Sequence, residues 1–169
     1  MPFTPFHIGP ALLFGLLLSA IFHFPTLLVA SIIPDVEPFC VMYFHVSGYP
    51  LHGFFHSYLG SSILAALVAV VVYPLRNLLD RIMRVFRISQ KSSFKILFTS
   101  FAGVYFHIFL DSFLYEEMRP FYPLEGNPFI NLLSAYGSDS VVYGFCIITA
   151  LLGIVLYFIK IRKGVVVLD

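Results

Sequence analysis

Long apolar stretches alternate with short polar segments along almost the whole chain. Five apolar runs cover residues 8–22, 25–33, 54–73, 96–115 and 141–159. These runs are continuous and do not alternate in polarity, and about 20 apolar residues are enough for a helix to cross a membrane. The pattern predicts an all-α, polytopic membrane protein, a helical bundle with four or five membrane helices.

The first two runs are shorter than the others. At ~1.5 Å per residue, a helix over residues 25–33 is too short to cross a hydrocarbon layer of about 30 Å. We expect the two runs to form a short helical hairpin with its tip at His23, Pro25 and Thr26.

The segment between the third and fourth runs is basic and periodic. Apolar residues recur at helical spacing from Leu75 to Phe86, and arginines take the positions between them. Residues 75–95 are therefore expected to form a cytoplasmic basic amphipathic segment, which either lies on the inner leaflet or is a solvated loop helix.

The basic residues also predict the orientation in the membrane. Nine of the ten Lys and Arg residues lie in residues 75–95 or at the tail: Arg76, Arg81, Arg84, Arg87, Lys91, Lys95, Lys160, Arg162 and Lys163. Basic loops face the cytoplasm, so the C-terminus is predicted inside and the N-terminus outside. Residues 34–53 and 116–140 are then outer loops, and prolines in the second of these suggest a lid. No long polar linker divides residues 1–169, which we expect to form a single integral membrane domain.

Composition agrees with a membrane protein and narrows the range of partners. The chain is 59% hydrophobic and 11% charged, too apolar for an ordinary soluble domain. A net charge of +1, without a basic stripe, gives no reason to expect nucleic acid as a partner. Because the chain is expected to lie in the membrane, membrane lipid is the expected partner. The two cysteines, Cys40 and Cys146, exclude a cysteine zinc ribbon, and pairing between them is not favoured because Cys146 lies in an apolar run.

Two pairs of polar residues have the spacing of metal ligands. His52 and His56 are four residues apart at the start of the third run, and His107 and Asp111 repeat this spacing near the end of the fourth. On a helix, residues four apart project from one face. The first pair lacks the glutamate of the HExxH metalloprotease pattern, because Gly53 follows the first histidine.

The predicted orientation brings these pairs to the same membrane face as three other residues, His7, Asp35 and Glu37. Taken singly, a histidine near a helix end is more often an interfacial residue, and an aspartate after proline is usually a turn former. Asp111 is harder to explain in that way, because an ionisable group within an apolar run is costly. Together they favour a metal site with six ligands: His7, Asp35, His52, His56, His107 and Asp111.

Imidazole and carboxylate ligands without thiolate suit zinc, with manganese or iron as alternatives. Six ligands suffice for one or two ions, and a pair of ions is an arrangement used in phosphoester displacement. We expect Asp35 or Glu37 to take the proton of the attacking water. Arg119, the one basic residue predicted outside, either binds a substrate phosphate or balances Glu116 and Glu117, and His45 is expected at the surface.

These motifs resemble those of the membrane-bound YdjM-like family of predicted metal-dependent hydrolases. That family has an N-terminal histidine, a PDxD/E element, an HRxxTH-like element and a later HxxxD, which match His7, Asp35 with Glu37, His52 with His56, and His107 with Asp111. The segment HGFFHS departs from the pattern at the Arg and Thr positions. The order of ligands is also similar, more distantly, to zinc-dependent phospholipase C and P1 nuclease, although their closing HxxxE element has no counterpart here. The resemblance implies a hydrolase acting on a small-molecule or lipid substrate.

Two other functions fit the same residues. A transport or ion-pathway protein also uses intramembrane His and Asp, but beyond the cluster the third and fourth runs offer only small hydroxyl residues such as Ser61 and Thr99. A noncatalytic scaffold would use the basic inner segment to bind a partner, with the metal purely structural.

Overall fold

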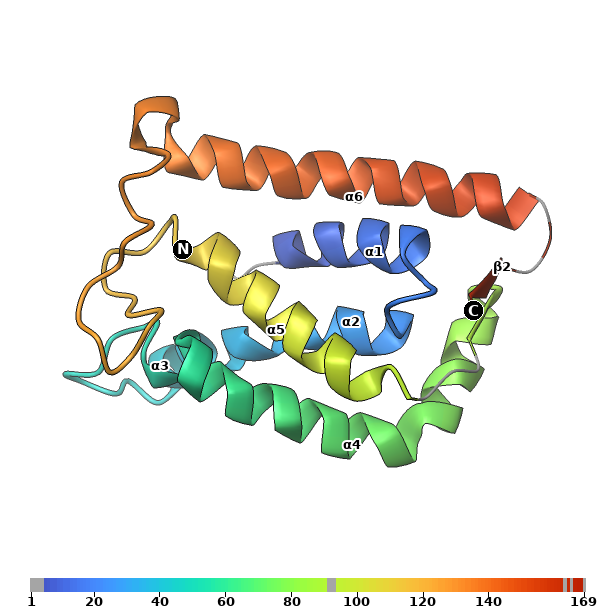
Figure 1. Ribbon diagram of the computed structural model, residues 1–169, viewed down its shortest axis with the longest axis horizontal. Coiled ribbons are helices and arrows are strands. Elements are labelled where there is room, and N and C mark those ends of the chain that lie inside the picture. Colours follow the sequence, from blue (N-terminus) through green and yellow to red (C-terminus); the bar gives the residue numbers. More distant parts are fainter. Residues whose placement is uncertain (1–4, 91–93, 163, 165, 169) are drawn as a thin grey trace.

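The computed structural model describes residues 5–90, 94–162, 164 and 166–168, and helices dominate this part of the chain. They are α1 (Ile8–Leu17), α2 (Phe24–Ala30), α3 (Val36–Tyr43), α4 (Tyr58–Val85), α5 (Ile96–Asp111) and α6 (Ser138–Arg162). Figure 1 shows α6 and α4 along two opposite sides of the molecule, with α1, α2 and α5 between them. The predicted all-α class is confirmed.

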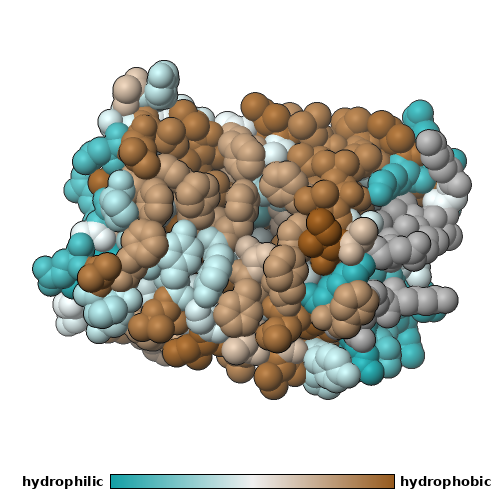
Figure 2. All heavy atoms as spheres, in the orientation of Figure 1, coloured by the Kyte–Doolittle hydropathy of each residue, from teal (hydrophilic) through white to brown (hydrophobic). Residues whose placement is uncertain are grey.

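Among the described residues, three helical segments are long and apolar enough to cross a membrane: Phe24–Tyr43, α4 and α6. The shorter apolar helices are α1 and α5, with 10 and 16 residues. Large apolar side chains such as Leu67, Val70 and Ile148 are more than half exposed on their outer faces, and apolar residues cover most of the face seen in Figure 2. An apolar surface of this extent suits contact with lipid.

The second apolar run is longer than the sequence indicated. α2 continues through a 3₁₀ turn, Ile33–Asp35, into α3, so the apolar helical segment Phe24–Tyr43 has 20 residues. Pro34 lies in this turn, and because proline lacks an N–H, the regular helix ends there and starts again. α1 and α2 pack together as in the predicted hairpin, but the estimate that the second helix is too short to span was wrong.

α4 also extends beyond its predicted end. It continues through Pro74 to Val85, a length of 28 residues, and bends in its last third (Figure 1), as a proline inside a helix causes. The basic segment is thus mainly the end of α4 and not a separate helix. Two three-residue strands, β1 (Ile88–Gln90) and β2 (Val166–Leu168), pair in parallel; they were not predicted. Lys91, Lys163 and Asp169 lie outside the described residues.

Small residues allow α1 to pack closely on α6. A Cβ atom on Gly9 would collide with the carbonyl oxygen of Cys146, and one on Gly153 would meet the Leu12 side chain. Close approach of this kind is typical of helix pairs in membranes, where packing replaces the hydrophobic effect. Cys146 is buried here as a free thiol, and Cys40 is also a free thiol.

The two ends of the bundle carry opposite charge. The loops over residues 44–57 and 112–137 lie at one end, and residues 18–23, 86–90 and the end of α6 lie at the other (Figure 1). Acidic residues gather at the first end, whereas Arg84, Arg87 and Lys160 belong to the second. Lys160 Nζ donates to the Leu16 carbonyl over 2.7 Å, at the C-terminal end of α1, where cations are favourable. Which end faces the cytoplasm remains the prediction made from the basic loops.

A buried polar cluster lies at the basic end, where the sequence indicated only a loop tip. His23, just before α2, is 1% exposed. Its backbone N–H donates to Thr99 Oγ1 over 2.9 Å, and its ring Nδ1 hydrogen-bonds to Thr26 Oγ1 over 2.6 Å. Burial, with a smaller effect from Lys95, lowers the pKa of His23 to about 4. The ring is therefore neutral at pH 7, and its 3.9 Å approach to Asp80 Oδ1 is not an ion pair there.

Candidate metal centre

Four side chains converge at the acidic end of the bundle. Asp35, His56, His107 and Asp111 each offer one ligand atom, and these atoms all lie within 4.8 Å of one another. We call these four residues the His/Asp centre. Asp35 comes from the turn between α2 and α3, His56 from the 3₁₀ turn Phe54–His56, and the other two from the end of α5.

The predicted pairing of His107 and Asp111 on one helix face is confirmed. His107 Nε2 lies 3.0 Å from Asp111 Oδ2, yet it makes no aligned hydrogen bond. Nδ1 of His107 donates to the Ser31 carbonyl over 2.7 Å. A carbonyl oxygen only accepts, so the proton of the neutral ring is at Nδ1 and the lone pair at Nε2 faces the centre.

Glu37 holds His56 in the same way. Nδ1 of His56 donates to Glu37 Oε2 over 2.7 Å, which leaves Nε2 buried without a hydrogen-bond partner and 3.8 Å from Asp111 Oδ2. A carboxylate behind a histidine is the usual support of a metal-binding imidazole. Glu37 therefore contacts His56 on the side of the ring that faces away from the centre.

Glu37 accepts three further hydrogen bonds from the loop that precedes α4. Its Oε1 accepts from the Tyr49 hydroxyl over 2.7 Å and from the Phe55 N–H over 3.1 Å, and its Oε2 accepts from the Gly53 N–H over 3.2 Å. Burial raises the pKa of Tyr49, so the hydroxyl keeps its proton and remains a donor. One carboxylate thus fixes the whole segment that carries His56.

His52 and His56 do not share a helix face, contrary to the prediction. α4 begins only at Tyr58, because the Ser57 side chain caps it by accepting from the Gly60 N–H over 3.0 Å. The His52 ring stacks on Tyr115 at 3.6 Å, and its Nδ1 lies 2.8 Å from Glu117 Oε1. Its ring centroid is 4.8 Å from that of His56. His52 thus lies beside the His/Asp centre and is not one of the four converging residues.

His7 contacts the centre from the 3₁₀ turn Pro5–His7, directly before α1. Its ring stacks on His107 at 4.0 Å, and its Nε2 lies 3.0 Å from Asp111 Oδ1. Its Nδ1 is buried and has no hydrogen-bond partner. His7 is therefore an adjacent imidazole in contact with both α5 residues.

The unpaired atoms indicate whether a cation fits. His56 Nε2, His107 Nε2 and Asp111 Oδ1 are all buried without a hydrogen-bond partner. Each such atom costs about 1–3 kcal/mol if nothing compensates it. A cation between two imidazoles and two carboxylates would compensate all three, and this donor set suits zinc, manganese or iron. Within the described residues, this is the one group of this kind.

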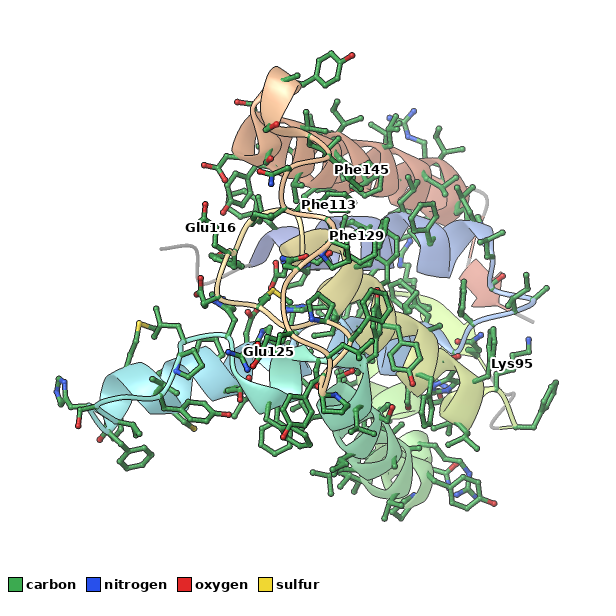
Figure 3. The ribbon with its side chains drawn as sticks, turned by 60° about the vertical axis from the view of Figure 1, so that its left-hand side comes forward. Lys95, Phe113, Glu116, Glu125, Phe129 and Phe145 are labelled. Carbon is green, nitrogen blue, oxygen red and sulfur yellow. The ribbon has the colours of Figure 1, made fainter. Side chains whose placement is uncertain are left out.

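A wide cavity of about 1040 Å³ opens at the acidic end, with His52, Gly53 and Arg119 in its wall. None of the four centre residues lines it, but its lining residue His52 lies beside His56 of the centre. Arg119 is exposed, and its Nη1 lies 3.7 Å from Glu125 Oε1. Its ion-pair partner in the structure is thus Glu125, not Glu116 or Glu117. Figure 3 shows Glu116 pointing outward from the acidic end. His45, expected at the surface, is exposed.

The loop between α5 and α6 is fastened over this end. Asn127 Nδ2 donates to the carbonyls of Ser112 and Tyr115 over 2.7 and 3.0 Å. The Phe129 ring lies 5.6 Å from that of Phe113 (Figure 3). The loop therefore covers the end of α5, where the predicted lid would lie.

Fold and site together define a polytopic α-helical membrane protein with a buried His/Asp group that could hold a metal ion. A comparison with protein families extends this description. Residues 1–168 match the family described as YdjM inner membrane protein, and the chain belongs to this family. No curated protein and no solved structure matches it. The resemblance drawn from the motifs is thereby confirmed over nearly the whole chain.

Proposed function

We propose that this protein is a metal-dependent hydrolase embedded in the membrane, and that it cleaves a phosphoester such as a phospholipid at the outward-facing surface of that membrane. One observation carries the proposal: four ligand atoms from separate elements lie within 4.8 Å of one another at the end of a membrane bundle. Zinc is the proposed ion, and manganese or iron would suit the same donors.

The roles of the four residues follow from their burial. His56, His107 and Asp111 are the closed part of the site, with side chains at most 2% exposed, whereas Asp35 is 12% exposed. Water and substrate would therefore enter past Asp35. A bound ion of this kind lowers the pKa of a water molecule and polarises a phosphoryl oxygen. Asp35 lies at this entry, and its carboxylate is the group proposed to accept a proton from the water.

Glu37 is assigned a positioning role in this proposal. Both of its oxygens already accept hydrogen bonds from four donors, so it has little capacity to take a proton from water. By fixing the Nδ1 proton of His56, it directs the Nε2 lone pair toward the ion. Of the two residues considered as the base, we therefore retain Asp35.

Arg119 is proposed to bind the substrate phosphate. It lies on the wall of the wide cavity, and its 3.7 Å pair with Glu125 is solvent-exposed. An exposed ion pair contributes at most about 1 kcal/mol. A substrate phosphate could therefore replace Glu125 as the partner of the guanidinium group at small cost.

Metal content and phosphoester hydrolysis, measured on one preparation, test the proposal. Protein purified in mild detergent is analysed for zinc, manganese and iron, and then reconstituted with phospholipid to follow headgroup release. We expect about one ion per chain and measurable release, with both lost in His107→Ala. His45→Ala, which alters an exposed histidine, is the matched control and should keep both.

Three results would contradict the proposal. A chain without bound metal would remove its basis. A chain with stoichiometric metal but no hydrolysis of any phosphoester tested would indicate a structural ion in a scaffold, and ion flux across liposomes that depends on His107 would indicate transport.

A further inference from the structure

A second cavity, narrow and largely apolar, lies between α1, α2 and α5. Its volume is about 180 Å³. α1 packs mainly on α6, and α5 packs mainly on α4. α2 contacts both α1 and α5. The cavity is the space left between α1 and α5, with α2 as its floor, and we call it the α1/α5 slot.

Aromatic pairs define the slot from one end to the other. At the His/Asp centre, the rings of His7 and His107 stack at 4.0 Å and line that end of the slot. Further along, Phe14 and Phe106 meet edge to face with centroids 6.0 Å apart. Phe22, in the loop after α1, lines the far end. The slot thus runs along α1, whose 10 residues correspond to a length of about 15 Å.

The polarity of the slot changes along its length. Its polar lining residues are His7, Ser31 and His107, all next to the His/Asp centre, and the remaining lining residues are apolar. The Ser31 hydroxyl is already bonded to the Leu28 carbonyl over 2.9 Å, whereas His107 Nε2 and His7 Nδ1 are buried without hydrogen-bond partners. One end can therefore receive a polar group, and the rest only hydrocarbon.

The aromatic side chains at the rim are only partly buried, and the floor is closed. Phe14, Phe22 and Phe106 are half-buried, whereas Leu27 and Gly103 beneath them are buried. α1 and α5 are apolar helices of a membrane bundle, so the molecules that reach this rim are lipids. An apolar cavity of about 150 Å³ holds a benzene molecule, so this slot has room for a stretch of about six to eight chain carbons.

We propose that the α1/α5 slot binds one hydrocarbon chain of a membrane lipid whose polar headgroup lies at the His/Asp centre. The placement of the headgroup rests on the proposed function, and it makes a chain-bearing lipid, not a water-soluble phosphoester, the substrate class. A hydrocarbon chain gains little free energy when it moves from lipid into an apolar protein cavity. The slot would therefore select lipid chains by the fit of their shape and length.

Photocrosslinking in reconstituted membranes tests chain binding without requiring catalysis. The probe is a phosphatidylethanolamine with a diazirine midway along one acyl chain, and labelled residues are identified by mass spectrometry. We expect labelling of Phe14 and Phe106 to saturate with the probe and to be competed by unlabelled lipid. Labelling of exposed residues such as Leu67 should rise linearly with the probe, because annular lipid exchanges freely.

A variant that fills the slot makes the test specific. Ala102 is a half-buried lining residue of α5, and Ala102→Phe should reduce saturable labelling at least five-fold while metal content is unchanged. The matched control is Ala66→Phe, which adds the same ring to an exposed position of α4 and should leave labelling intact. If Ala102→Phe does not reconstitute, Ala102→Leu fills part of the same space and should reduce labelling at least two-fold.

The outcomes separate the two proposals. Saturable labelling in the slot without any hydrolysis supports chain binding and contradicts the hydrolase. Hydrolysis that is unaffected by either Ala102 variant, with labelling spread linearly over all lipid-facing residues, overturns the slot and leaves the hydrolase in place.

Discussion

Replacement of Glu37 by glutamine would show whether this residue supports the metal centre or takes part in chemistry. The native carboxylate accepts two hydrogen bonds at each oxygen, from His56 and Gly53 at one and from Tyr49 and Phe55 at the other. Glutamine keeps the shape but replaces one oxygen with an NH₂ group, which donates. In either orientation of the amide, its NH₂ group faces two of the four hydrogen-bond donors, and these two lose their acceptor.

Each orientation of the glutamine amide has a definite cost. If the NH₂ group faces His56, the imidazole must move its proton to Nε2, which removes the lone pair that would bind the ion. If it faces Phe55, a backbone N–H loses its acceptor, at about 1–3 kcal/mol. Loss of a residue that supports a metal ligand typically weakens metal affinity by about 10–100-fold. We therefore expect Glu37→Gln to raise the Kd for zinc by this factor.

A competition titration with a zinc-binding dye in detergent measures this Kd. Glu125→Gln is the control, because Glu125 is an exposed carboxylate of the neighbouring cavity and should leave the Kd unchanged. The reasoning is refuted if Glu37→Gln binds zinc as tightly as the native protein but loses turnover, since that combination identifies Glu37 as the general base.

Three further predictions concern stability. Removal of the ion by a chelator should lower the thermal midpoint of the native protein, since an ion at 100 times its Kd stabilises by about 2.7 kcal/mol; the midpoint of His107→Ala should not respond to the chelator. Gly9→Leu should lower the thermal midpoint in detergent by separating α1 from α6, whereas Gly144→Leu, where an added Cβ meets no atom within 4 Å, should not. The pKa of His23 is lowered from 6.5 to about 4 on folding, so the unfolded chain binds its proton first as pH falls. Stability should thus decrease between pH 6.5 and 4, by about 3 kcal/mol, and His23→Asn should flatten the dependence in urea titrations.

The helices and the α5 ligand pair were accessible from sequence because they depend on local pattern. The apolar runs locate the three candidate spans and the two shorter apolar helices, and His107 and Asp111 share a face because both lie within one regular helix. The prediction that His52 lies in a helix with His56 was wrong, also for a local reason. The helix start is set by the cap at Ser57, and the apolar run around it, which begins at residue 54, conceals that boundary.

The supporting contacts of the site depend on tertiary structure and left little trace in the sequence. The partner of His107 is a backbone carbonyl, that of Ser31, and any residue type can supply it. Glu37 was recognised as chemically relevant, but its four donors come from a loop that folds back from residues 49–56. His23 lies at a chain reversal, a position typical of surface residues, but it is buried and hydrogen-bonded to Thr26 and Thr99, and the second of these contacts is far away in the sequence.

The His/Asp centre also constrains how the protein is made. Its four residues are spread from Asp35 to Asp111 along the chain, and α6 supplies none of them. During synthesis, the four residues of the centre are therefore all present in the chain once α5 has been made, before α6 is complete. The centre therefore joins the turn after α2, the turn before α4 and the end of α5, and its four residues all lie within the first two thirds of the chain.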